Sequence, residues 1–186
     1  MSAMKHLGTE RLETRRLILR RFTADDAPAA YRNWTSDGEV TRFLTWPTHK
    51  SQAETQAILE DWVTHYKDPA YYQWAIVPKG NCNEPIGSIA VVSHDDRVEK
   101  AAIGYCIGRK WWHQGFTSEA LAAVIDFLLH RVELRRVEAY HDARNPHSGE
   151  VMKKCGMTFE GTLRASVQNN QGICDACWYG ILKDEK

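Results

Sequence analysis

The sequence has no long hydrophobic run and no net charge. No apolar stretch approaches the length of a membrane span, and the polar, charged N-terminus lacks the apolar core of a signal peptide. Lysine plus arginine equals aspartate plus glutamate, at 24 each, so bulk electrostatics gives nucleic acids or anionic membranes no attraction. We therefore expect a cytoplasmic protein whose partners are neither nucleic acids nor membranes.

Motifs for metals and disulfides are also missing. Eight histidines are scattered without a His-x-x-x-His pair or a Cys/His cluster of ligand spacing, so we expect no metal. Cys174 and Cys177 form a Cys-x-x-Cys, but residues three apart in a strand point to opposite faces, which argues against zinc or a redox pair. The cysteines are an odd set without a paired framework, typical of a reducing compartment: Cys82, Cys106, Cys155, Cys174 and Cys177.

Internal repeats, low-complexity tracts and linkers are absent as well. A chain of 186 residues suffices for one domain with a substantial core and is short for two. Hydrophobic residues make up 43% of it and seven are tryptophans, so a packed globule is expected rather than disorder. We predict that residues 1–186 form a single α/β (α+β) domain with a mixed sheet.

The most informative stretch is residues 101–130, in which a strand pattern, a glycine-containing turn and a helix pattern follow one another. Gly108 and Gly115 lie in the turn, and Thr117 or Ser118 is placed to cap the helix. Apolar residues recur at helical spacing at Leu121, Val124, Ile125, Leu128 and Leu129. A helix N-terminus after such a turn presents unpaired N–H groups and a positive dipole, which suit a phosphate. An ordinary strand–helix connection would show the same pattern.

The remaining segments alternate between strand and helix patterns. Helices are expected after caps at Thr23, Ser51 and Asn145, the second of these in a Ser-x-x-Glu capping box. The last two strands are expected as a hairpin around residues 169–172. The first strand carries arginines that we expect on a solvated face: Arg15, Arg16, Arg20 and Arg21. Strands are predicted at 12–23, 72–77, 84–93, 100–107, 134–141, 157–167 and 173–182.

Five motifs occur in a fixed order along the chain. They are Glu-Thr-Arg-Arg-Leu-Ile-Leu-Arg from residue 13, Ile-Gly-Tyr from 103, Trp-His-Gln-Gly-Phe-Thr-Ser-Glu-Ala from 112, Asn-Pro-His-Ser from 145 and Lys-Cys-Gly-Met from 154, with Glu-Gly just beyond. Over residues 10–182 this combination resembles the GNAT N-acetyltransferases, in particular the RimJ/RimL-type ribosomal-protein N-terminal acetyltransferases. The resemblance implies the GNAT fold: a central mixed, mostly antiparallel, splayed β-sheet flanked by helices.

The same resemblance implies acetyl-CoA as co-substrate and no metal. The preceding strand would hydrogen-bond the pantetheine arm through Cys106, Ile107 and Gly108. Asn145 would contact the arm near the thioester, and the alternative for this residue is a plain helix cap. The pyrophosphate of acetyl-CoA would be bound by the backbone amides of Trp112, His113, Gln114, Gly115, Phe116, Thr117 and Ser118. Trp112 stands where the family usually has Gln or Arg, and Thr117 where it has Gly or Ala. Because the contacts are mainly backbone amides, both changes should be tolerated.

Acetyl transfer needs a polarised carbonyl, a proton for the departing thiolate and a neutral amine. A backbone N–H near Ile107 could polarise the carbonyl. The resemblance points to Ser148, one helical turn after Asn145, as general acid, while a small residue packed in that turn is equally plausible. Tyr140 and Tyr179 are the other candidate donors, of which Tyr179 fits the core better.

The base is not assigned by the sequence. Many relatives place a glutamate where this chain has Ala102, and Glu99 nearby is expected in a solvated turn. His141 titrates in a suitable range, so it is a candidate catalytic base; it could equally be a hydrogen-bonded strand-end histidine, or water could take the proton.

The acceptor implied is a primary amine, either a protein N-terminus or a small molecule. Trp46, in a Trp-Pro loop, is the best candidate to line its site. The missing glutamate leaves a second hypothesis open, a coenzyme A-binding sensor or scaffold without turnover. A homodimer is a plausible assembly because symmetric pairs are common.

Overall fold

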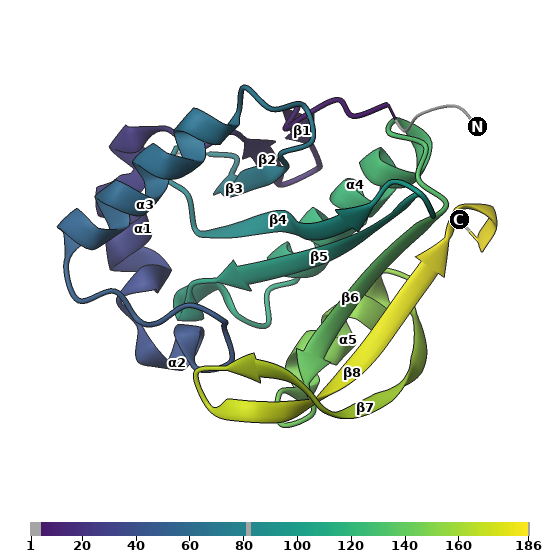
Figure 1. Cartoon of the computed structure of the whole chain (residues 1–186). Helices are drawn as coiled ribbons and strands as arrows, with labels where there is room; N and C mark the ends of the chain where they lie inside the picture. Colours follow the sequence, from purple (N-terminus) through teal and green to yellow (C-terminus); the bar gives the residue numbers. More distant parts are fainter. Residues whose placement is uncertain (1–4, 81–82, 186) are drawn as a thin grey trace.

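The computed structural model describes residues 5–80 and 83–185, and their eight strands form one sheet. Figure 1 shows the strands in the order β1-β2-β3-β4-β5-β6-β8-β7. Their bounds are β1 Leu12–Glu13, β2 Leu17–Arg20, β3 Gln73–Pro78, β4 Gly87–Asp95, β5 Lys100–Ile107, β6 Arg136–Asp142, β7 Thr158–Asn169 and β8 Gly172–Leu182. All neighbouring strands are antiparallel except β5 and β6, which are parallel. The mixed, mostly antiparallel sheet is therefore confirmed.

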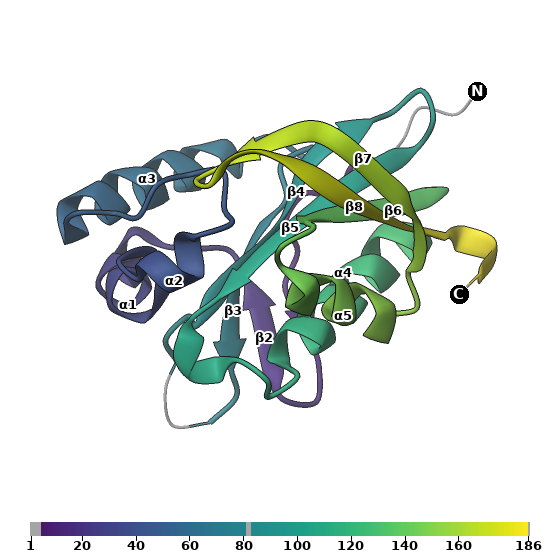
Figure 2. The same cartoon turned by 90° about the horizontal axis from the view of Figure 1, so that it is seen from below.

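Helices cover both faces of this sheet. Figure 2 shows α4 and α5 on one side of the strands and α1, α2 and α3 on the other. The α-helices are α1 Ala27–Ala30, α2 Gly38–Thr41, α3 Gln52–His65, α4 Phe116–His130 and α5 Pro146–Lys154. Short 3-10 turns occur at Ala24–Asp26, Arg109–Trp111 and Lys183–Glu185, and a π-helical turn at Tyr31–Thr35. No helix of the described residues is long and apolar enough to span a membrane.

Strand β3 shows how the two layers are made, because it is buried on both faces. Trp74 and Ile76 belong to the core beneath α4 and α5, whereas Ala75 and Val77 belong to the core beneath α1 and α3. This follows from the two-residue period of a strand. The apolar positions predicted on α4 are all fully buried in the first core: Leu121, Val124, Ile125, Leu128 and Leu129. The prediction for this helix is confirmed.

The N-terminal prediction was partly wrong. A single strand was expected at 12–23, but the chain turns after Glu13 and forms the antiparallel pair β1 and β2. The expected solvated face is not uniform either, since Arg20 forms a two-pronged ion pair with the buried Asp26 at 2.7 and 2.8 Å. Both differences arise from contacts that lie outside the strand itself.

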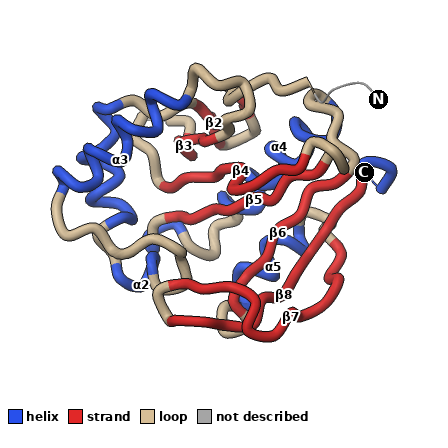
Figure 3. Tube along the Cα trace, in the orientation of Figure 1, coloured by secondary structure: helices blue, strands red, loops and turns tan. Residues whose placement is uncertain are grey.

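The predicted order of the later elements, from α3 to β8, is confirmed. Before α3, the single helix expected after Thr23 is divided into a 3-10 turn, α1 and a π-helical turn, and α2 was not predicted. Figure 3 shows the helices and strands in separate colours. Ser51 caps α3 by accepting a hydrogen bond from the Glu54 N–H, and β7 and β8 form the final hairpin. Cys174 is buried and Cys177 is half-buried, and both are free thiols. Cys82 lies outside the described residues.

Candidate active site

The turn before α4 presents a row of peptide N–H groups. His113 and Gly115 have left-handed backbones, with φ of 59° and 78°. The first turn-closing bond runs from the Glu119 N–H to the Gly115 carbonyl at 3.1 Å, and the N–H groups of residues 113–118 have no partner within the described chain. Successive N–H groups at a helix N-terminus, with its positive dipole, form an anion-binding cradle.

Two details of the sequence prediction change at this turn. The helix begins at Phe116 with Gly115 as N-cap, so neither Thr117 nor Ser118 caps it, because the left-handed Gly115 brings the chain into the helix earlier. The Trp112 N–H donates to the Arg109 carbonyl at 3.2 Å, which leaves the free row one residue shorter than predicted.

The N-terminal segment fixes the cradle through one carboxylate. Glu119, in the first turn of α4, accepts hydrogen bonds from the Thr14 hydroxyl at 2.6 Å, the Arg16 N–H at 2.8 Å and the Arg16 Nε at 2.6 Å. Burial alone would raise the pKa of Glu119, but the hydrogen bonds from Thr14 and Arg16 outweigh it and lower that pKa. The carboxylate therefore joins β1 and β2 to α4.

Arg16 also places positive charge beside the cradle. Its Nη1 donates to the Gln114 carbonyl at 3.0 Å, and its guanidinium lies 4.5 Å from the centre of the Phe116 ring. Sequence reasoning assigned Arg16 to a solvated face and missed this role. The only signal was the recurrence of the motif that contains it.

A gap opens between β5 and β6 next to the cradle. The two strands pair only over Lys100–Ala102 and Arg136–Glu138, and beyond this they diverge, as Figure 1 shows. The splayed sheet is therefore confirmed. Gly108 donates its N–H to the Ile86 carbonyl, and the Ile107 carbonyl accepts from Trp112 Nε1 at 2.9 Å. Because adjacent residues of a strand direct their peptide groups to opposite sides, the Ile107 N–H faces the gap.

Of the three pantetheine contacts predicted on β5, these facts favour Ile107. The Gly108 N–H is already bonded to Ile86, so it is not free to hold a ligand. The Cys106 thiol is buried 3.4 Å from the Ser88 hydroxyl, on the side of the sheet that α1 and α3 cover. Burial raises the pKa of this thiol, so it is a packed, protonated side chain.

Ser148 meets Tyr105 across the gap. The Tyr105 hydroxyl lies 2.9 Å from the Ser148 carbonyl oxygen and 3.0 Å from Ser148 Oγ. A carbonyl only accepts, so Tyr105 donates to it and the serine hydroxyl donates to the tyrosine oxygen. Burial raises the pKa of Tyr105 well above its usual range, which keeps it a phenol.

Asn145 occupies the N-cap position of α5 without capping it through its side chain. Its amide makes no hydrogen bond within the described residues, while its carbonyl accepts from the Ser148 N–H at 3.2 Å. The amide is thus free for a ligand, and it lies one helical turn before Ser148.

His141 is buried at the end of β6, with 8% of its surface exposed. Its Nδ1 donates to the Asp142 carbonyl at 2.8 Å, so Nε2 is the acceptor nitrogen of the neutral ring. A Cβ added at Gly149 would lie 2.6 Å from this Nε2 and 3.1 Å from the Tyr179 hydroxyl. Both side chains therefore reach the first turn of α5 beside Ser148. Tyr179 is a core residue, as expected.

Among the residues that the structure describes, no free carboxylate is found at the position of the missing glutamate. Ala102 is paired with Glu138, whose carboxylate is bound by Lys100 at 2.9 Å and by Arg136 at 2.8 Å. Glu99 lies in the turn before β5, as expected from the sequence, and its carboxylate is ion-paired with the exposed Arg135. Of the bases considered from the sequence, His141 and water therefore remain the candidates.

Trp46 lies in the loop between α2 and α3, where the tip of the β7–β8 hairpin reaches it. The Asn170 amide donates to the Trp46 carbonyl at 2.7 Å and to the Thr41 carbonyl at 2.8 Å. The Trp46 ring is half-buried, 5.2 Å from the ring of His49. The loop that contains Trp46 and the tip of the β7–β8 hairpin are thus in contact, although they are 124 to 129 residues apart in the sequence.

Comparison with known proteins agrees with this geometry. The family model described as an acetyltransferase (GNAT) domain matches residues 16–158. The chain is 30% identical over 172 residues to YoaA, an uncharacterized N-acetyltransferase of Bacillus subtilis, covering 92% of this chain and 96% of YoaA. It is 27% identical over 144 residues to the ribosomal-protein-serine acetyltransferase of Escherichia coli, covering 77% and 79% of the two chains.

Among solved structures, RimL, a ribosomal L7/L12 α-N-protein acetyltransferase in complex with coenzyme A, has the same fold. It superimposes with a TM-score of 0.82 at 22% identity, covering 95% of this chain and all of RimL's. Because the family model spans most of the chain, including the cradle and Ser148, this protein belongs to the GNAT acetyltransferase family.

Proposed function

We propose that this enzyme transfers the acetyl group of acetyl-CoA to a primary amine, with the diphosphate bound at the turn before α4. The observation that carries the proposal is the row of unpaired N–H groups at residues 113–118, next to the open edge of β5. These residues fit the co-substrate, because an anion satisfies donors that nothing in the described chain satisfies. Lys110 adds an exposed cation at this turn, whereas Arg16 and Arg109 are ion-paired with Glu119 and Asp37.

Each of the chain's reacting groups has a defined part. The Ile107 N–H polarises the thioester carbonyl from the open edge of β5, and the free amide of Asn145 holds the pantetheine arm. The Ser148 hydroxyl, by rotating away from Tyr105, supplies a proton to the departing sulfur. His141 Nε2 accepts the proton that the amine loses, so one proton is taken up for each one delivered.

The acceptor is a protein N-terminus or a small-molecule amine. A protein N-terminus is supported by the similarity to the Escherichia coli ribosomal-protein-serine acetyltransferase. Trp46 would line the acceptor side, where Asn170 joins its loop to the β7–β8 hairpin.

A coenzyme A sensor is the second candidate, because Ala102 replaces the usual glutamate and Glu138 beside it is fully paired. In the test, acetyl-CoA is incubated with a panel of amines and N-terminal peptides, and free thiol is measured. The enzyme proposal predicts thiol release with at least one acceptor, and a loss of about 10²-fold or more in kcat for Ser148→Ala. Binding of coenzyme A without thiol release across the panel would favour the sensor.

A further inference from the structure

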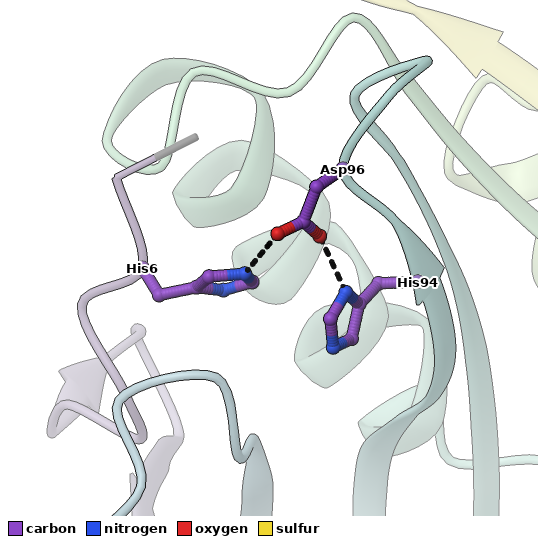
Figure 4. Close-up of side chains that lie close together, drawn as sticks. All are labelled: His6, His94 and Asp96. Carbon is purple, nitrogen blue, oxygen red and sulfur yellow. Dashed lines mark hydrogen bonds and ion pairs between the residues drawn. The ribbon is translucent and has the colours of Figure 1, made fainter. Parts of the chain in front are cut away.

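Three potential metal ligands meet far from the acetyl-transfer site, although they lie far apart in the sequence. His6 comes from the N-terminal segment, His94 from the end of β4, and Asp96 from the turn before β5, as Figure 4 shows. One ligand atom from each lies within 4.8 Å of the other two. No spacing motif could reveal the group, because His6 and Asp96 are 90 positions apart.

The two imidazoles share one carboxylate. His6 Nε2 lies 3.3 Å from Asp96 Oδ2, and His94 Nδ1 lies 2.6 Å from Asp96 Oδ1. Within the described chain no lysine or arginine pairs with Asp96, whose neighbour Asp95 takes Arg97 instead. The negative charge is thus matched only by groups that bind either a proton or a metal ion.

Of the three separations between ligand atoms, the one between His6 and Asp96 already suits a small tetrahedral ion. Two ligands at about 2.0–2.1 Å from a tetrahedral centre are about 3.3 Å apart, which is the observed separation of His6 Nε2 and Asp96 Oδ2. His94 Nδ1 must move away from Asp96 by less than about 1 Å, and its side chain, 33% exposed at the end of a strand, is free to do so.

His6 is also supported from behind, as metal-bound histidines usually are. Its other nitrogen, Nδ1, lies 3.0 Å from the hydroxyl of the buried Tyr72, which in turn accepts the Leu7 N–H at 3.2 Å. The His6 side chain is only 12% exposed, so its ring orientation is held before any ion arrives. The His6 and His94 rings meet edge-on with their centres 4.9 Å apart.

We propose that His6, His94 and Asp96 bind a divalent transition-metal ion, Zn²⁺ in particular, with water in the fourth position. Two imidazoles and one carboxylate favour Zn²⁺, Ni²⁺, Cu²⁺ or Co²⁺ over Mg²⁺ and Ca²⁺, which prefer all-oxygen sites. This departs from the expectation of no metal. The site lies at the start of β5, and Ile107 at its other end is about 24 Å away. The ion is therefore a clamp that ties the N-terminal segment to the β4–β5 turn, without part in acetyl transfer.

The test is calorimetric titration of the full chain with Zn²⁺ at fixed neutral pH. We expect one saturable equivalent, with affinity at least about tenfold lower in His94→Ala, in Asp96→Asn and in Tyr72→Phe, which deletes only the supporting hydroxyl. His65→Ala is the matched control, because His65 also pairs with an aspartate, Asp61 on α3, but the two belong to no three-ligand group among the described residues. The Zn²⁺ affinity of this variant should equal that of the wild type. Coenzyme A binding should be the same in all four variants, which shows that they fold.

Co²⁺ titration identifies the donors by their absorption. We expect a visible band of tetrahedral intensity without the near-ultraviolet band of sulfur ligands, and we expect it to vanish in the double variant His6→Ala/His94→Ala. Absence of saturable uptake, uptake of equal affinity in the double variant, or a sulfur band would each overturn the proposal.

Discussion

Replacing Glu119 with glutamine tests how the N-terminal strands are attached to the cradle helix. The carboxylate accepts three hydrogen bonds, and the amide oxygen of the glutamine side chain can keep those from the Thr14 hydroxyl and the Arg16 N–H. The NH2 group of the glutamine amide would face the Arg16 Nε–H. Because both groups are hydrogen-bond donors, the charge-assisted hydrogen bond of 2.6 Å is lost.

The magnitude follows from this change and from the burial of the pair. A hydrogen bond to a charged group contributes about 1.5–3 kcal/mol, and the Arg16 side chain, 35% exposed, recovers some hydration when released. We therefore expect Glu119→Gln to lower the free energy of unfolding by about 1.5–2.5 kcal/mol. Urea denaturation followed by circular dichroism measures it, and the m-value should stay unchanged.

The matched control is Glu150→Gln on α5, whose carboxylate is ion-paired with the exposed Lys153 at 2.8 Å. This substitution should change the free energy of unfolding by less than about 0.5 kcal/mol. If Glu119→Gln were no more destabilising than Glu150→Gln, the carboxylate would not join the N-terminal strands to α4, and the reasoning would be refuted.

Three further predictions concern the α5 side of the site. Tyr105→Phe removes the hydroxyl that contacts the Ser148 hydroxyl, so we expect kcat to fall about tenfold while the KM for acetyl-CoA stays nearly unchanged. A kcat equal to that of the wild type would show that this contact does not position the serine. Gly149→Ala places a Cβ 2.6 Å from His141 Nε2, so we expect the free energy of unfolding to fall by about 1–3 kcal/mol, measured by thermal unfolding. A Tm equal to that of the wild type would contradict this close packing. The hydrogen bond from Arg144 is the main cause that lowers the pKa of Asp142 in the folded protein. Its carboxylate therefore stabilises the fold above pH ~4, the pKa in the unfolded chain, and this stabilisation is lost as the pH falls from there toward the folded pKa. Urea denaturation at pH 7 should show Asp142→Asn less stable than the wild type by about 2 kcal/mol, and this difference in the free energy of unfolding should become smaller below pH ~4. A difference that does not change with pH would argue against the lowered pKa of Asp142.

Secondary structure could be predicted from the local sequence pattern wherever a single hydrophobic periodicity extends over a whole segment. The α4 helix has apolar residues at every core-facing position, so its buried face could be predicted from spacing alone. The hairpin of β7 and β8 was equally predictable, because residues 169–172 are strong turn formers.

What could not be predicted depends on contacts between distant residues. The break between β1 and β2 is held by Glu119, which is 105 residues from Thr14. The helix start at Gly115 depends on the left-handed backbones of His113 and Gly115, and histidine adopts that conformation too seldom for a sequence pattern to reveal it. Tyr105 as the partner of Ser148 was likewise missed, because the two meet only where β5 and β6 diverge.

The central claim is that the free N–H groups at residues 113–118 bind the diphosphate of coenzyme A. Calorimetric titration with coenzyme A tests it on the wild type and on Gly115→Pro, since proline requires φ near −65° where Gly115 has 78°, and removes one N–H. Gly172→Pro, at a hairpin turn with φ of 90°, is the equally strained control. We predict one equivalent bound by the wild type and by the control, and at least tenfold weaker binding by folded Gly115→Pro, about 1.4 kcal/mol or more. No uptake by the folded wild type, or equal uptake by all three, would contradict it.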